Sequence, residues 1–310
     1  MVHGSSSSFL AFDLTSAGAP PAWQRDRDPQ TEAFITARLA GLAKLIDQSG
    51  ADLITLGGDF RLGGRRKRDD FLDGALALSR VGQHTSSVRL AAAIPVDQAG
   101  PQQLRSTLSA VDVSTANRAG WVVENRVGVS GIEMIAQSLG TGPHSPTVVV
   151  NIEDEADISL AAAHADVARL RVTTVEEGRN LRSRIKTKAQ QLGRQAEDID
   201  VVVDVRVVIA DEVEAASNRA EFIAELTPAP GDDLLQHVGT PRTFATVWHN
   251  WVRAGAADGF TIIPASIPTD VVHVSAEVIT ELRQRGLRSA ATPELVGAAA
   301  PSSAGEVVAA

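Results

Sequence analysis

Apolar and polar residues follow one repeating plan along the chain: a short apolar run, then a longer stretch whose apolar positions recur every three or four residues. The short runs have the length of strands and the longer stretches have helical periodicity. The pattern predicts strands at residues 9–14, 52–56, 88–96, 119–123, 147–152, 166–172, 199–209 and 259–263. It predicts helices around residues 35–46, 69–81, 101–111, 130–139, 156–163, 175–192, 212–226, 244–252 and 270–285.

Strands that alternate with helices predict a parallel sheet, and eight of them match an α/β TIM (β/α)8 barrel. An open doubly wound sheet is the alternative, but no predicted strand leads into a Gly-x-Gly-x-x-Gly turn or a Walker loop. We therefore expect a flexible N-terminus over residues 1–8, a single barrel domain over 9–287 and a disordered Ala/Pro-rich tail over 288–310.

The composition and charge of the chain limit the classes of function that fit it. The 310 residues include 44% hydrophobic and 22% charged residues with a net charge of -9, which is typical of a soluble enzyme and argues against nucleic acid as a partner. No apolar run is long enough to span a membrane, and the N-terminus lacks the features of a signal peptide, so we expect a cytoplasmic protein. The chain has no cysteine, and its histidines show no paired metal-ligand spacing, so we expect no metal.

Acidic and amide residues gather where several predicted strands end. Asp59 follows the second strand, Glu124 and Asn125 follow the fourth, and an acidic run (Glu153, Asp154, Glu155 and Asp157) follows the fifth. In a parallel barrel these ends meet at one mouth, which carries the site. The acidic run could bind a divalent cation or could lie in the first turn of the following helix, where the helix dipole favours acids. The helix interpretation is favoured because the acids are contiguous.

Several segments resemble the luciferase-like flavin monooxygenase family, in particular its nitrilotriacetate and long-chain-alkane monooxygenase branch. The most specific is Arg118-Ala119-Gly120-Trp121, which is similar to that branch's Gly-Arg-x-Gly-Trp turn. The other matching segments are residues 18–23 with Asp28-Pro29, residues 50–56 with Asp59, residues 161–166, and Gly239-Thr240-Pro241 with residues 255–260. The matches occur in the family's order over residues 10–287.

The resemblance implies a TIM barrel, usually homodimeric, that holds reduced FMN or a deazaflavin at the strand ends. The cofactor would carry oxygen or hydride chemistry to a small organic substrate, with a flavin reductase as partner. On this resemblance the cofactor-lining residues are Asp59, Ile94, Glu124, Asn125 and Glu153, and no catalytic residue is implied.

The strand ends also depart from the family's pattern. Relatives commonly place Thr-Ser after the fourth strand and a Ser-containing, Gly-rich turn after the fifth, where they donate hydrogen bonds to the flavin phosphate; this chain has acidic residues in both places. A phosphate about 5 Å from a carboxylate is repelled by several kcal/mol per charge pair at an effective dielectric constant of about 20. The N-terminal loop has Ala19-Pro20-Pro21 where a His would sit, and the connection between the fourth and fifth strands is short. The alternative hypothesis is therefore an inert barrel that has lost flavin binding and acts as an interaction or subunit partner.

Other motifs have plain structural interpretations. Trp121 could stack on a flavin, but core packing is favoured at a turn-to-strand junction. The basic loop at residues 65–68 could attract an anion, although a solvated loop is favoured. His164 is expected to pack structurally, and His249 to be a partly exposed helix residue.

Overall fold

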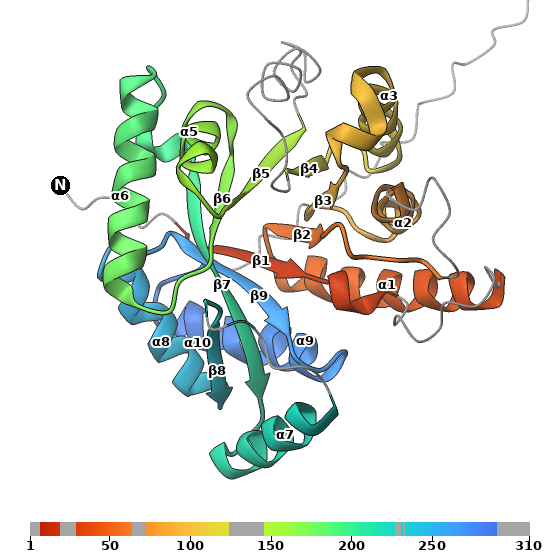
Figure 1. Cartoon of the computed structure of the whole chain (residues 1–310). Coiled ribbons are helices and arrows are strands. Elements are labelled where there is room, and N and C mark those ends of the chain that lie inside the picture. The colour runs from red at the N-terminus through yellow and green to blue at the C-terminus, as the bar shows by residue number, and fades with distance from the viewer. Residues whose placement is uncertain are drawn as a thin grey trace, which may run out of the picture.

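The structure is a computed structural model that describes residues 7–18, 29–63, 72–123, 146–226, 231 and 233–289. Within these residues, eight parallel strands close into a barrel, with helices around the outside (Figure 1). The barrel strands are β1 (Phe9–Asp13), β2 (Leu53–Leu56), β3 (Arg89–Ala93), β4 (Ala119–Val123), β5 (Thr147–Ile152), β6 (Val167–Leu170), β7 (Asp200–Ile209) and β9 (Gly259–Pro264). The ring closes because β6 pairs with β7, β7 with β9, and β9 with β1. The predicted TIM barrel is confirmed.

One further strand, β8 (Leu235–Gly239), lies outside the ring and pairs in parallel with the second half of β7. The hydrophobic pattern did not predict it. Leu235 and His237 are half-buried, whereas Gln236 and Val238 are exposed, so the strand lacks the apolar run of a barrel strand. Residues 205–209 of β7 extend beyond the part that pairs with β6, and β8 uses their free hydrogen-bonding edge.

The helices follow the predicted periodicity closely. They are α1 (Pro29–Ser49), α2 (Asp73–Val81), α3 (Val96–Ser114), α5 (Glu155–His164), α6 (Val175–Gln191), α7 (Val213–Leu226), α8 (Pro241–Arg253), and a continuous run of α9 (Thr269–His273), a π-helical turn (Val274–Val278) and α10 (Ile279–Gln284). The third strand ends earlier than predicted because Pro95 already precedes α3. The helix expected at residues 130–139 lies outside the described residues. No helix of the described residues is long and apolar enough to cross a membrane.

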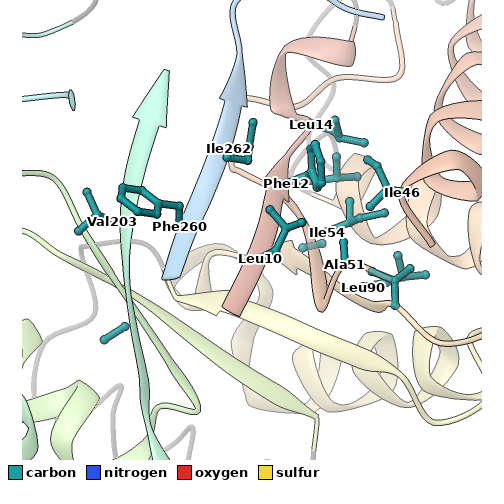
Figure 2. Close-up of a cluster of buried hydrophobic side chains, with 14 of the residues drawn as sticks. Leu10, Phe12, Leu14, Ile46, Ala51, Ile54, Leu90, Val203, Phe260 and Ile262 are labelled. Carbon is teal, nitrogen blue, oxygen red and sulfur yellow. The ribbon is translucent and has the colours of Figure 1, made fainter. Parts of the chain in front are cut away.

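Two apolar layers hold the barrel together. The larger layer lies between the strands and the surrounding helices; Figure 2 shows Phe12 and Ile54 among the side chains near Ile46 of α1. The second layer fills the inside of the barrel, the lumen, and is formed by Phe9, Ala11, Leu53, Ala91, Ala93, Val122, Val149, Val167 and Val202. Because successive strand residues point to opposite faces, every barrel strand except β9 supplies both layers.

The N-terminal ends of the strands form the base of the barrel, where the same contact recurs around the ring. An aspartate directly before one strand accepts a hydrogen bond from a backbone amide of the neighbouring strand. The three pairs are Leu10 N with Asp52 (2.8 Å), Val148 N with Asp166 (2.8 Å) and Val201 N with Asp258 (2.9 Å). Two of these aspartates also form ion pairs, Asp52 with Arg288 (2.8 Å) and Asp258 with Arg182 (2.6 Å). Arg288, placed in the predicted tail, is therefore buried against the barrel.

The segment that carried the most specific resemblance also lies at the base. Arg118 donates hydrogen bonds to the carbonyl oxygens of Gly82, Thr85 and Val88 and so fixes the turn that leads into β4. A Cβ on Gly120 would lie 2.8 Å from the Cβ of Ala91, which explains the glycine. Trp121 is fully buried in the outer layer, as its core-packing interpretation predicts. The contacts of this motif therefore stabilise the base of the barrel.

Close strand packing at Gly259 yields a stability prediction. A Cβ at this position would lie 1.8 Å from the backbone oxygen of Phe9, which cannot move without breaking the β1–β9 pairing. We expect Gly259→Ala to lower the free energy of unfolding by about 3 kcal/mol or more, measured by urea denaturation. The matched control is Gly41→Ala, at an exposed position of α1 with no atom within 4 Å of the added methyl, which should stabilise by up to about 1 kcal/mol. Equal effects of the two substitutions would contradict this packing.

A second prediction concerns Asp200, at the start of β7. Burial and the nearby charge of Asp258 raise its pKa from 3.8 to about 6. The folded state therefore keeps a proton that the unfolded state has lost, so stability falls as pH rises from about 4 to about 6 and is constant above. We expect Asp200→Asn to remove this loss, on the order of 2 kcal/mol, when urea unfolding at pH 4.5 and 7.5 is compared with the wild type. The exposed Glu197→Gln is the control, and an unchanged pH difference in Asp200→Asn would refute the assignment.

Candidate functional site

Polar side chains collect in the lumen at its C-terminal end, which we call the mouth. In five strands a polar residue follows the last apolar lumen residue by two positions and so points to the same side. These residues are Asp13, Thr55, Asn151, Arg169 and Asp204, and the register adds Thr261, which pairs with Ala11 and with Asp204. Together they form a polar layer above the apolar filling of the barrel.

Arg169 of β6 organises this layer. Its Nε and Nη2 donate to the two carboxylate oxygens of Asp204, each at 2.9 Å, which is the bidentate geometry that suits a guanidinium. Nη2 also lies 2.8 Å from Oδ2 of Asp13, and Nη1 donates to the Thr55 hydroxyl at 3.2 Å. Because Arg169 and Asp204 are each only 5% exposed as side chains, these charges depend on one another for solvation.

The pKa values of Asp13 and Asp204 shift in opposite directions. Burial alone would raise the pKa of Asp13, but Arg169 and the hydrogen bonds from Thr15 hold it below its ordinary value. Burial raises the pKa of Asp204 above its ordinary value, although Arg169 opposes the shift. Burial would lower the pKa of Arg169, and the two carboxylates raise it instead, so the guanidinium stays charged. The charge states of the three groups therefore depend on one another.

The network reaches the loops of the mouth through Asp13. The Thr15 amide donates to Oδ1 of Asp13 at 3.0 Å, and the Gly57 amide donates to the Thr15 hydroxyl at 2.7 Å. A continuous set of contacts thus joins Arg169 to the loops after β1 and β2. Asp59 lies on the second of these loops.

Two buried polar atoms beside the network have no hydrogen-bond partner among the residues that the structure describes: Oγ1 of Thr261 and Oδ1 of Asn151. Thr261 is fully buried, and Asn151 is half-buried and pairs in register with Arg169. Buried polar atoms are almost always hydrogen-bonded, so unpaired ones in a barrel mouth indicate a place where a bound molecule or water supplies the partner.

The residues that the sequence predicts for cofactor binding are placed as follows. Asp59 is exposed on the turn after β2, and Glu153 is exposed after β5. Ile94 is buried in the outer layer, and its carbonyl oxygen accepts a hydrogen bond from Nε1 of Trp121 at 3.1 Å. Glu124 and Asn125 lie outside the described residues. The cofactor role of all five residues stays a prediction.

The acidic run after β5 forms a helix cap. Asp154 precedes α5 and accepts from the amides of Ala156 (2.8 Å) and Asp157 (3.0 Å). Asp157 accepts in return from the amides of Glu153 (2.9 Å) and Asp154 (3.1 Å), which completes a capping box. The helix interpretation of this run is confirmed.

Three other residues could in principle hold an ion. Among the described residues, one ligand atom each from Asp211, His273 and Glu277 lies within 4.8 Å of the others. The His273–Glu277 spacing of four residues on one helix was a signal that the sequence analysis missed. Its 2.9 Å contact is an ordinary ion pair along the helix, and the two acids are exposed, so we assign no metal to this group.

The central residues of the mouth, Asp13, Arg169 and Asp204, were also missed, although the sequence carries a signal for them. Arg169 and Asp204 are charges within otherwise apolar strands that are buried on both faces. A charge in such a strand is costly unless it has a partner, and that partner must come from across the lumen.

The fold is a parallel α/β TIM barrel with polar side chains at its mouth. The solved structures similar to it include the EDTA monooxygenase of Chelativorans sp. BNC1, with a TM-score of 0.73 and 13% identity over 92% of this chain and 95% of that one. The oxygenating constituent of 3,6-diketocamphane monooxygenase from Pseudomonas putida, in complex with FMN, has a TM-score of 0.64 and 11% identity over 89% and 99%. The coenzyme F420 dependent tetrahydromethanopterin reductase of Methanopyrus kandleri has a TM-score of 0.60 and 13% identity over 89% and 99%.

These likenesses confirm the barrel type that the motifs predicted. At 11–13% identity they show the fold alone. No protein-family model and no curated protein sequence matches the chain.

The Arg169 network gives a prediction of its own. Arg169→Met leaves two buried carboxylates without a cation and should lower the free energy of unfolding at pH 7 by about 3–5 kcal/mol in urea denaturation. The matched control combines Arg169→Met with Asp13→Asn and Asp204→Asn, which removes the stranded charges and should recover much of that loss. A single substitution that costs less than about 1 kcal/mol would contradict the network.

Proposed function

We propose that the protein is a flavin-dependent oxidoreductase of the monooxygenase type that acts on a small organic molecule at the barrel mouth. The observation that carries the proposal is the pair of unpartnered buried polar atoms, Thr261 Oγ1 and Asn151 Oδ1, beside a fixed charged network. Polar groups that converge above an apolar lumen suit a flat ring with hydrogen-bonding edges. The similar structures include one in complex with FMN and one of a coenzyme F420 dependent enzyme, which supports a flavin or a deazaflavin here.

The ring end of such a cofactor fits the residues present. Asn151 Oδ1 can accept from a ring N–H. The Thr261 hydroxyl is fully buried, so it can donate to a ring atom only when the side chains that cover it move aside. Arg169 keeps the mouth loops in place through Asp13 and Thr15, and the apolar lumen below it excludes water. When bound, the cofactor supplies the redox chemistry, and the protein orients and shields it.

The phosphate end of FMN fits less well. The amides at the start of α5, which could hold an anion, already donate to Asp154 and Asp157. This observation favours the second candidate, an inert barrel that has lost flavin binding and serves as an interaction or subunit partner. A homodimer and a flavin reductase partner belong to the first proposal by analogy with the family.

The deciding measurement is a titration with reduced FMN, oxidised FMN and a deazaflavin, followed by calorimetry or by the fluorescence of the four Trp residues. We expect saturable binding near micromolar concentrations. Thr261→Val should weaken binding about fivefold by removing one hydrogen bond, and it should not destabilise the protein, because that hydroxyl has no partner. No binding of any of the three compounds would refute the enzyme proposal and favour the inert barrel.

A further inference from the structure

Strand β8 ends the sheet and leaves one of its edges open. In the part of the chain that the structure describes, β8 pairs with β7 alone, on the side of β7 away from β9 (Figure 1). The Gly239 carbonyl oxygen accepts from the Ala210 amide at 3.1 Å, so Gly239 and every second residue before it direct their backbone groups to β7. The amides and carbonyls of Gln236 and Val238 therefore point away from the sheet, and both side chains are exposed.

The sequence of β8 does not protect this edge. Open edges pair readily with another strand, and proteins usually prevent this with lysine, proline or a bulge. The strand is Leu-Gln-His-Val-Gly, which has no proline, and its register with β7 runs through all of it without a bulge. Burial lowers the pKa of His237 to about 4, so its ring is neutral at pH 7. The edge is thus uncharged along its whole length.

Charged residues of opposite sign flank β8. Asp233 precedes the strand, and its carboxylate is 56% exposed and lies 3.8 Å from Arg171. Arg242 follows the strand in the first turn of α8, where it is exposed and has no ion pair with any described residue. An antiparallel strand of the same sequence would bring the start of each copy beside the end of the other. Each Asp233 would then face an Arg242.

Apolar side chains also lie close to this edge. Helix α7 packs against β8, and Ala216 is the only residue of this helix that is buried. Phe222 and Leu226, near the end of α7 that leads to β8, are 60% and 67% exposed, and Val238 is 40% exposed. A pair of short strands is only marginally stable in water, so an association through β8 needs such apolar surface to bury.

We infer that two copies of this chain associate through β8, antiparallel about a two-fold axis at His237. In this register Gln236 of one copy lies opposite Val238 of the other, and the two residues exchange backbone hydrogen bonds in both directions. His237 lies opposite its own copy in the non-hydrogen-bonded pair on the axis. The same patch serves both copies, as a two-fold interface requires. The inference does not depend on the proposed cofactor.

Sedimentation velocity of the full chain tests the association. We expect the wild type to sediment as a dimer at about 50 μM, and Val238→Pro to raise the dissociation constant at least about tenfold, because proline removes an edge N–H that β7 does not use. Val238→Thr keeps that donor and is the matched control, which should stay dimeric. A monomeric wild type would overturn the inference, and so would a Val238→Pro variant that folds by circular dichroism and dimerises as the wild type does.

Cysteine cross-linking tests the register. The chain has no cysteine, so a single introduced thiol can pair only with its copy in a second molecule. Facing Cα atoms in a non-hydrogen-bonded antiparallel pair are about 4.5 Å apart, within reach of a disulfide, so His237→Cys should give a covalent dimer in a glutathione redox buffer.

The control for cross-linking is Gln236→Cys, which is more exposed but whose two copies lie diagonally across the pair, beyond the reach of a disulfide. We expect it to cross-link at least about tenfold more slowly than His237→Cys. Cross-linking of Gln236→Cys as fast as that of His237→Cys would overturn the inference. The absence of a covalent dimer from His237→Cys would overturn it as well.

Charge reversal tests the strand ends and leaves β8 itself unchanged. Asp233→Arg and Arg242→Asp each place like charges at both ends of the interface, so each should raise the dissociation constant about tenfold. The two substitutions in one chain restore opposite charges and should return the constant to within about threefold of the wild type. A double variant that dimerises more weakly than either single variant would overturn the inference.

Discussion

A single buried cation determines how this barrel closes at its functional end. Arg169 projects from β6 into the lumen, where it meets carboxylates from β7 and β1 and a hydroxyl from β2. Removing an arginine from water costs several kcal/mol unless its donors find charged acceptors, so the residue is tolerable only while these strands stand at the right distance. Asp13 also positions the loops after β1 and β2. It accepts a hydrogen bond from the Thr15 amide, and the Thr15 hydroxyl accepts one from the Gly57 amide.

The base and the mouth of the barrel have different physical tasks. At the base, aspartates before β2, β6 and β9 tie each strand to its neighbour, and Arg118 does the same work before β4. These contacts hold neighbouring strands together at the end of the barrel opposite the mouth, so their role is in stability. At the mouth, the polar groups satisfy one another only in part, which leaves Thr261 and Asn151 without partners.

This division explains what the sequence could reveal. The hydrophobic pattern predicted the eight barrel strands correctly. The segments that resembled the luciferase-like family around Asp52, Arg118, Asp166 and Asp258 lie at the base, so they implied the barrel independently while carrying little information about function. The helix cap at Asp154 could also be predicted from the sequence, because it depends on two residues three positions apart. The Arg169 network could not be assembled from sequence, since it joins β1, β2, β6 and β7 across the lumen. Strand β8 was missed because its pairing depends on how far β7 extends past β6.

The charge of the mouth bears on which ligand it suits. One guanidinium faces two carboxylates, so the network carries a net negative charge when both are ionised and none when Asp204, whose pKa is raised, holds a proton. An anionic ring would favour the protonated state of Asp204, and a neutral ring would leave the balance undisturbed. At the β5–α5 turn, the amides at the start of α5 likewise have carboxylates of the chain itself as acceptors. A ligand that enters the mouth therefore meets carboxylates of the chain in both places.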